Sequence, residues 1–278
     1  MQPRDHALFK RFPLSGKAKL SIGEVPTPYH IYDGYGLFIG GTADLEPVKR
    51  LIANEQVIPM QTEDGRALMG LWICDFTDAS LEPHHELQFS IFISRGPVRS
   101  VPAQPLALLA AMLTRRDMQM MCHGLWNNTS KVVAYNRELL SLDARLTAST
   151  IQREASSIRF AFTDAPTGAA LLTGSCALPA RTPQALNSAL MGQMGFFKAI
   201  RSLMAPSIHM EVVNPLGVVL PRNATADAYT KTASTTLHTF DTQTDRLDIE
   251  APRYRDLNFT PQLVQFMDGF KFVYLTPR

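Results

Sequence analysis

Residues 84–94 read His-His-Glu-Leu-Gln-Phe-Ser-Ile-Phe-Ile-Ser, and this alternation of polar and apolar residues decides the fold class. Leu87, Phe89, Ile91 and Ile93 face one way, and His84, Glu86, Gln88 and Ser90 face the other. The pattern predicts a strand whose polar face meets solvent. The alternative is a cone or barrel whose interior presents Glu86 to a ligand. A buried Glu86 would have a raised pKa and could carry protons.

Short strand-like segments recur along the chain and are mostly separated by Gly, Pro, Asn and Asp. Beyond 84–94 they lie at 67–75, 131–136, 157–163, 169–176, 208–213, 217–220, 233–240 and 269–275. Helices are predicted at 44–54, 105–116 and 183–204, while residues 1–41 are typical of loop with short strands. The simplest interpretation is one mainly antiparallel α+β domain that covers residues 1–278.

Composition favours a globular protein without a nucleic-acid or membrane partner. Charged residues make up 19% of the 278 residues and the net charge is only +2. The low charged fraction indicates hidden surface, in a large core or in subunit contacts, and together with the apolar helices it leads us to expect a homo-oligomer. The N-terminus lacks the apolar core of a signal peptide and no apolar run is long enough to span a membrane. A cytoplasmic protein is therefore expected.

Known catalytic and metal-binding motifs are missing from the sequence. Three cysteines without CxxC spacing argue against a disulfide framework and a cysteine-based zinc site. The adjacent residues His84 and His85 would point to opposite faces of a strand, so they do not form a metal site together. Nucleotide-binding glycine motifs and the GxSxG elbow do not occur. We therefore predict no metal and no cofactor.

Two segments could contribute to a binding site. Residues 124–133 read Gly-Leu-Trp-Asn-Asn-Thr-Ser-Lys-Val-Val, which places Lys131 at the predicted mouth of a strand. A desolvated lysine there would have a lowered pKa and could form a Schiff base, whereas the alternative is a solvated strand-end lysine. The helix that carries Met194 and Phe197 is typical of core or a subunit interface, and it would also suit a lid over an apolar ligand.

The order of these features resembles the acetoacetate decarboxylase superfamily over most of the chain. A Tyr/Gly-rich strand leads into the helix at 44–54, and His84-His85-Glu86-Leu87-Gln88 resembles the family strand whose glutamate enters the active site. Cys122-His123-Gly124-Leu125-Trp126 resembles the family's Gly-Arg-Glu-Leu segment. Residues 209–214, 237–241 and 270–275 resemble the closing strands. The resemblance implies a curved sheet closed into a cone or barrel around an internal pocket, with a few flanking helices.

The chain departs from the family at the family's Pro-Lys-Lys, where it has Thr129-Ser130-Lys131. Without a gap, Ser130 takes the place of the Schiff-base lysine and Lys131 that of the second lysine, and a slip of one residue would make Lys131 the nucleophile. The arginine that holds the substrate carboxylate in the family has no clear match. This suits a divergent member with a larger, more apolar and uncharged substrate, and the helix at 183–204 resembles an insertion or lid.

The resemblance implies a lyase-type enzyme, such as a decarboxylase or aldolase-dehydratase, that acts on an apolar oxo compound. Glu86 would be the proton shuttle, and Lys131 would be a Schiff-base or electrostatic residue. The substrate contacts would come from Ser130, Asn127, Asn128, Trp126, His84, Gln88, Met194 and Phe197. Two alternatives stay open: a non-covalent cyclase or dehydratase of secondary metabolism, and a non-catalytic small-molecule binder on the same fold.

Overall fold

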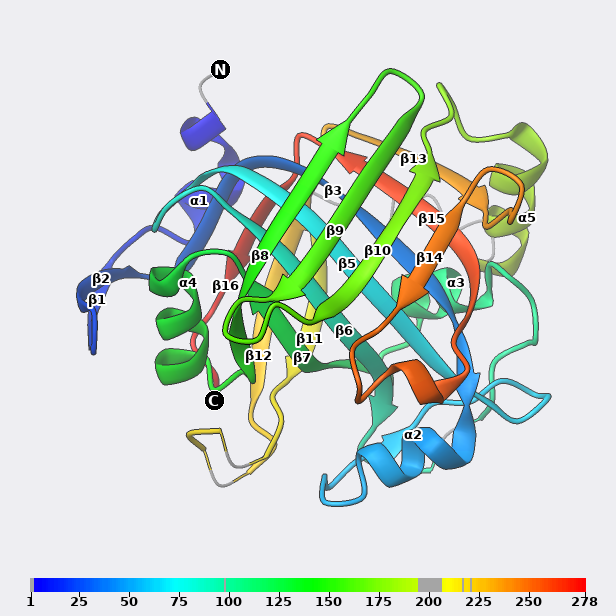
Figure 1. Ribbon diagram of the computed structural model, residues 1–278, viewed down its shortest axis with the longest axis horizontal. Coiled ribbons are helices and arrows are strands. Elements are labelled where there is room, and N and C mark those ends of the chain that lie inside the picture. The colour runs from blue at the N-terminus through cyan, green and yellow to red at the C-terminus, as the bar shows by residue number, and fades with distance from the viewer. Residues whose placement is uncertain (1–2, 98, 195–206, 217, 221) are drawn as a thin grey trace.

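A computed structural model describes residues 3–97, 99–194, 207–216, 218–220 and 222–278 (Figure 1). Most of its secondary structure is strand, in one 14-stranded sheet and one two-stranded hairpin, β1 (Gly16–Leu20) and β2 (Gly23–Thr27). Within these residues no helix has both the length and the apolar character needed to cross a membrane.

Seven strands of the large sheet close into a ring of hydrogen-bonded neighbours. In ring order they are β3 (Tyr29–Asp44), β5 (Arg66–Ala79), β6 (His84–Ser94), β7 (Gln119–Asn127), β11 (Ile208–Val213), β12 (Thr225–Lys231) and β16 (Lys271–Tyr274), which pairs again with β3. The expected closure of the sheet is therefore present as a ring of hydrogen-bonded strands. Its pairs are antiparallel except β7 with β11, and β7 also pairs in parallel with β8, so the sheet is mixed.

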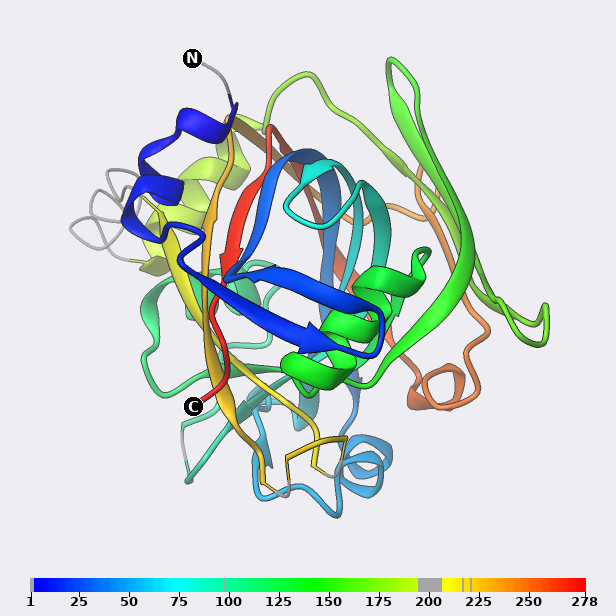
Figure 2. The same cartoon turned by 90° about the vertical axis from the view of Figure 1, so that its left-hand side faces the viewer.

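The remaining strands extend the ring outward (Figure 2). An arm follows from β7 through β8 (Ala144–Arg153), β9 (Ser157–Asp164), β10 (Ala170–Ala177) and β14 (Arg246–Ile249). On the other side, β13 (Ser234–Thr239) pairs with β15 (Thr260–Asp268), which pairs with β3. The short β4 (Ile58–Pro59) pairs with the end of β6.

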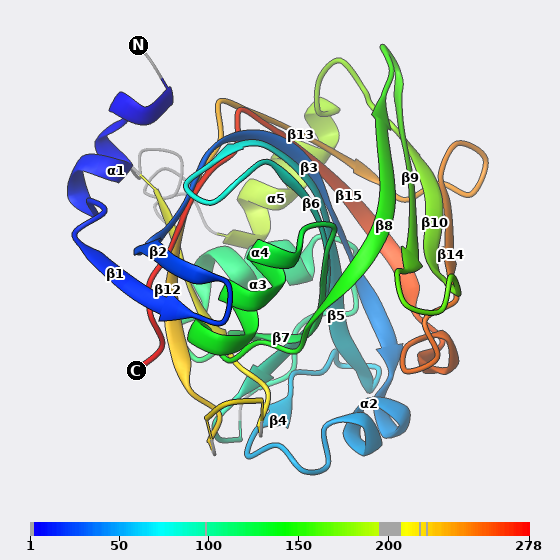
Figure 3. The same cartoon turned by 60° about the vertical axis from the view of Figure 1, so that its left-hand side comes forward.

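Helices are short and flank these strands. They are η1 (Pro3–Asp5), α1 (Ala7–Arg11), α2 (Leu45–Leu51), α3 (Ala107–Thr114), α4 (Ser130–Ala134), the π-helical turn η2 (Tyr135–Leu139), α5 (Gln184–Met194) and η3 (Arg255–Leu257). Figure 3 shows the ring strands curving around α3 and α4. The predicted helix at 183–204 is confirmed over Gln184–Met194, and its remainder lies outside the described residues.

Alternation along the ring strands creates two hydrophobic cores. Leu87, Phe89 and Ile91 of β6 face outward into a core shared with β9 and β10. The alternate residues of β6 face inward. One of them, Phe92, packs with Phe38 and with residues of α3. The alternation of residues 84–94 therefore gave the right strand and the right two faces, and the polar face lies inside the ring rather than in solvent.

Two predicted strands are wrong. Residues 131–136 belong to α4 and η2, because the N–H of Val133 donates to the carbonyl of Thr129 at 3.1 Å and the chain coils. This coil buries Val132, Ala134 and Tyr135, and that tertiary packing outweighs the β preference of two adjacent valines. Of the predicted strand at 217–220, residues 218–220 form bends, and residue 217 lies outside the described residues.

Candidate active site in the strand ring

A cavity lies inside the ring, and six of the seven ring strands contribute to its wall. Its lining is mostly apolar: Trp72, Cys74, Phe76, Glu86, Gln88, Met120, Met210, Val212, Ala228, Thr230, Phe270, Phe272 and Tyr274. The volume of about 60 Å³ is small beside the roughly 300–1,000 Å³ of typical ligand pockets. Only a small ligand therefore fits without movement, and not the larger substrate expected from the sequence. The flexible side chains of Met120 and Met210 can adapt to a larger one.

Glu86 is the carboxylic acid of this lining. It lies on β6 directly opposite Asn127 of β7, and the Asn127 Nδ2 donates to its Oε2 at 3.2 Å. Burial in the apolar cavity disfavours the charged carboxylate and raises the pKa of Glu86 to about 7, while the hydrogen bond from Asn127 acts in the opposite direction. A carboxyl with this pKa can accept and donate protons near neutral pH.

A second amide fixes the orientation of Asn127. The Nδ2 of the buried Asn136, on η2, donates to the Oδ1 of Asn127 at 2.9 Å. Because the Asn127 oxygen is thereby occupied, its NH₂ group is the end that faces Glu86. The chain Asn136–Asn127–Glu86 links the π-helical turn to the cavity.

His84 lies two residues before Glu86 and is buried beside Tyr29. Its Nδ1 lies 2.9 Å from the carbonyl oxygen of Glu82, so Nδ1 must carry the proton, and Nε2 accepts from the Tyr29 hydroxyl at 2.8 Å. Burial lowers the pKa of His84 to about 4, and it raises the pKa of Tyr29. His84 is therefore a neutral group that holds Tyr29, and it is not part of the cavity lining.

The remaining polar groups of the cavity are Gln88, Trp72, Thr230 and Tyr274. The Nε2 of Gln88 donates to the hydroxyl of Ser90 at 2.7 Å, which keeps the amide within the ring. In contrast, the buried indole Nε1 of Trp72 has no hydrogen-bond partner among the described residues. A buried donor without a partner is costly, and a ligand oxygen could satisfy it.

Lys131 and Ser130 lie outside the set of residues that line the cavity. Lys131 is on α4, its side chain is 44% exposed, and its Nζ pairs with Glu82 at 3.3 Å. Ser130 is exposed at the first position of the helix. Asn128 is close by, and its Oδ1 accepts from the backbone N–H of His85 at 2.8 Å, which ties the end of β7 to the start of β6.

Two of the three predicted apolar contacts, Trp126 and Met194, also lie outside the cavity lining. Trp126 faces the outer core, where it packs against Phe89 and Tyr254, because it lies on the opposite face of β7 from Asn127. Met194, at the end of α5, packs against Ala110 of α3. Phe197 lies outside the described residues. The structure thus brings together Glu86, Asn127 and Gln88 from the predicted set.

Metal-binding groups do not gather anywhere in the described part of the chain, where no set of three or more His, Cys, Asp or Glu side chains could hold an ion. Cys74, Cys122 and Cys176 are all buried as free thiols, and burial raises the pKa of each.

No protein-family model and no curated protein sequence matches the chain. Solved structures do match it. Acetoacetate decarboxylase from Legionella pneumophila superposes with a TM-score of 0.59 at 10% identity, over 98% of this chain and 94% of that one. The chain has the acetoacetate decarboxylase fold. A second acetoacetate decarboxylase structure gives a TM-score of 0.53 at 14% identity, over 90% of this chain and 87% of that one. The enduracididine biosynthesis enzyme MppR, complexed with pyruvate, also gives 0.53 at 9% identity, over 91% and 90%.

The acetoacetate decarboxylase fold places in the cavity several residues that sequence reasoning missed. Trp72 lies within an apolar run that gave no reason to separate it from its neighbours, although alternation along β5 puts it on the inner face with Cys74 and Phe76. Asn136 does not line the cavity but supports it through Asn127, and it gave no signal in the sequence because its role depends on the π-helical turn.

Proposed function

We propose that this chain is an enzyme that transfers a proton on a small, uncharged oxo compound in the ring cavity, as part of a lyase or cyclase reaction. The observation that carries the proposal is Glu86: a single carboxylic acid in a largely apolar cavity, with a pKa of about 7. A general base is most effective when its pKa lies near the working pH. The cavity lining contains no lysine or arginine among the described residues, which favours an uncharged substrate.

In the proposed reaction, the Glu86 carboxylate removes a proton from the carbon next to the carbonyl group. The electron pair of that C–H bond moves to the carbonyl oxygen and gives an enolate. Trp72 lines the cavity and its indole N–H has no partner among the described residues, so it would donate to that oxygen. Glu86, now protonated, returns the proton to a leaving group or to another carbon, so one residue serves as base and then as acid.

Lys131 has an electrostatic role in this proposal rather than a covalent one. A Schiff base requires a neutral amine at the substrate carbonyl. The Lys131 ammonium instead pairs with Glu82, and almost half of its side chain is exposed. Ser130, which the resemblance places at the nucleophile of the family, is exposed as well. The geometry therefore favours the non-covalent alternative over the Schiff-base mechanism.

Deuterium exchange tests the proton transfer without knowledge of the product. A panel of small uncharged ketones is incubated with the protein in D₂O, and the loss of α-proton signals is followed by proton NMR. We expect catalysed exchange with at least one ketone, and a decrease of roughly 10²–10⁴-fold in Glu86→Gln, which keeps the shape but removes the general base. Equal exchange rates in the two proteins would contradict the proposal.

Borohydride separates the two lysine roles. The ketone that exchanges fastest is incubated with the protein and sodium borohydride, and peptides are mapped by mass. We expect no adduct on Lys131 and substantial exchange activity in Lys131→Arg, since arginine keeps the charge but cannot form an imine. A reduced adduct on Lys131, together with loss of activity in Lys131→Arg, would favour the Schiff-base lyase.

A further inference from the structure

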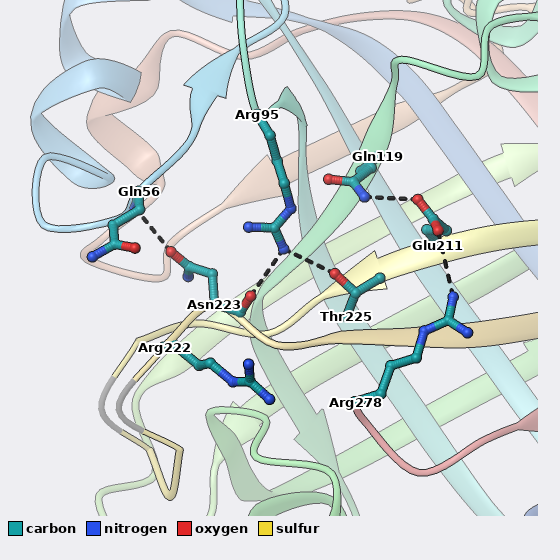
Figure 4. Close-up of a pocket in the computed structure, with 8 residues that line it drawn as sticks. All are labelled: Gln56, Arg95, Gln119, Glu211, Arg222, Asn223, Thr225 and Arg278. Atoms are coloured by element: carbon teal, nitrogen blue, oxygen red, sulfur yellow. Dashed lines mark hydrogen bonds and ion pairs between the residues drawn. The ribbon is translucent and has the colours of Figure 1, made fainter.

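A polar cleft lies on the outer face of the ring, lined by Gln56, Arg95, Gln119, Glu211, Arg222, Asn223, Thr225 and Arg278 (Figure 4). Its volume of about 450 Å³ is in the range of small-molecule sites. Strand alternation separates it from the ring cavity: Gln119 and Glu211 face the cleft, whereas their neighbours Met120 and Met210 face the cavity. The two hollows therefore use opposite faces of β7 and β11.

Arg95 is held in the cleft without a carboxylate. Its Nη2 donates to the carbonyl oxygen of Asn223 at 2.9 Å and to the hydroxyl of Thr225 at 2.8 Å, both neutral acceptors. Asn223 is itself fixed, because its Oδ1 accepts from the backbone N–H of Gln56 at 2.8 Å. The guanidinium is not paired with a carboxylate and is already ordered, so a ligand that binds there does not have to order it.

Arg222 adds a second guanidinium, from the segment between β11 and β12. Its guanidinium makes no hydrogen bond or ion pair within the described residues, and the residue is exposed in the wall of the cleft. The geometry of a guanidinium group suits two parallel hydrogen bonds to a carboxylate or phosphate group.

Three acidic groups near the cleft are already engaged. One is Glu55, which accepts from the Nδ2 of Asn223 and from the backbone N–H of Leu216. Glu211 accepts from the Nε2 of Gln119 at 2.7 Å, and it lies 3.7 Å from the Nη2 of Arg278. The same Nη2 pairs with Asp227 at 3.2 Å. Arg278 thus pairs with both Glu211 and Asp227, whereas neither Arg95 nor Arg222 pairs directly with a carboxylate in the described part of the chain.

We propose that this cleft binds a small molecule through a phosphate or polycarboxylate group, held between Arg95 and Arg222. The polar lining fits an anion and does not fit the apolar oxo compound proposed for the ring. The neutral side chains of Gln56 and Gln119 can bind the remaining polar groups of the ligand.

Titration calorimetry with inorganic pyrophosphate and with citrate tests this site, at an ionic strength kept constant with NaCl. We expect at least one of the two anions to bind to the wild-type protein. Arg222→Gln and Arg95→Gln should weaken that binding about 10- to 100-fold, as expected for the loss of a charge-assisted hydrogen bond. Tighter binding of pyrophosphate than citrate would indicate a phosphate ligand, and the reverse a polycarboxylate.

Arg116→Gln is the matched control, since Arg116 is exposed and lies outside the cleft. It removes the same charge and should change the affinity less than twofold. The proposal is overturned if the wild-type protein binds neither anion, if Arg222→Gln binds as tightly as wild type, or if Arg116→Gln weakens binding equally. Glu86→Gln should bind the anion normally, so this test does not depend on the proposed proton transfer.

Discussion

Two influences on the pKa of Glu86 act in opposite directions: burial raises it and the hydrogen bond from Asn127 lowers it. Asn127→Ala removes the hydrogen bond and leaves the burial. We expect the midpoint of the pH–rate profile for ketone exchange to move above about 7, by some tenths to one pH unit, because exchange requires the carboxylate. The measurement is the exchange rate between pH 5 and pH 9.

Asn128→Ala is the control for that shift. Asn128 is the neighbouring residue, but its side chain accepts from the backbone of His85 and does not contact Glu86 through any described hydrogen bond. The midpoint of the pH–rate profile of Asn128→Ala should equal that of the wild-type protein. An unchanged midpoint in Asn127→Ala would show that the hydrogen bond does not tune the carboxyl.

The raised pKa of Glu86 also has a cost in stability. The folded state holds the proton up to about pH 7, whereas the unfolded chain releases it near pH 4.5, so the free energy of unfolding falls as pH rises between these values. Glutamine does not ionise, so Glu86→Gln lacks this loss of stability with rising pH. In urea unfolding, the free energy of unfolding of Glu86→Gln relative to that of wild type should increase from pH 5 to pH 8, by on the order of 1–3 kcal/mol.

His84 provides the opposite dependence, and it is present in both proteins. Its pKa is lowered to about 4, so its stabilising effect is lost as pH falls from about 6.5. The difference between variant and wild type therefore isolates Glu86. A constant difference in unfolding free energy over this pH range would show that Glu86 ionises normally.

At the scale of elements, β7 depends on a glycine where it passes η3. A Cβ added at Gly124 would lie 2.2 Å from the hydroxyl of Tyr254. That ring cannot move easily, because it stacks on Phe89 at 4.0 Å and its hydroxyl bonds to His123 at 2.8 Å. We expect Gly124→Ala to lower the free energy of unfolding by about 1–3 kcal/mol through overpacking.

Gly96→Ala offers a comparison, since no heavy atom lies within 4 Å of an added Cβ there. Thermal unfolding of both variants measures the effect, and Gly96→Ala should stay close to wild type. If the two glycine variants were equally stable, the contact between β7 and Tyr254 would not constrain the strand.

The elements that could be predicted from sequence are those whose own residues specify them. Residues 84–94 gave β6 with its bounds and both faces, because the alternation is strict. The 16-residue β3 was expected only as loop with short strands, since Gly36, Gly40 and Gly41 weaken its local strand preference. Close packing against a neighbouring strand requires a glycine here instead, because a Cβ on Gly41 would clash with the Thr260 carbonyl oxygen of β15.

The candidate site divides in the same way. Glu86 and Gln88 could be predicted, because they belong to that alternating strand. The position of Lys131 could not, because the valines after it favour a strand in isolation, whereas the burial of Val132, Ala134 and Tyr135 accompanies a helix. Local preference is a weak guide where tertiary contacts decide the outcome.

At the scale of the whole molecule, the homo-oligomer stays a prediction. Several large apolar side chains are exposed in the described structure: Leu14, Ile22, Ile58, Met191, Ile208 and Val219. Single exposed apolar side chains are common on monomers, so the prediction rests on the low charged fraction of the sequence and its apolar helices. Light scattering at micromolar concentration should give at least twice the 30.9 kDa of one chain, and a mass of 30.9 kDa would contradict the prediction.

The closure of the ring has a consequence for how the protein is made. The pairs Ile31 with Phe272 and His30 with Val273 join segments from near the two ends of the sequence. A growing chain therefore cannot complete the cavity until residues 271–274 have left the ribosome. Until then β3 and β12 each lack a partner strand, and unpaired edges of this kind promote aggregation. The nascent chain thus exposes these edges during part of its synthesis, and refolding of the complete chain should be slow because its contacts are so distant in sequence.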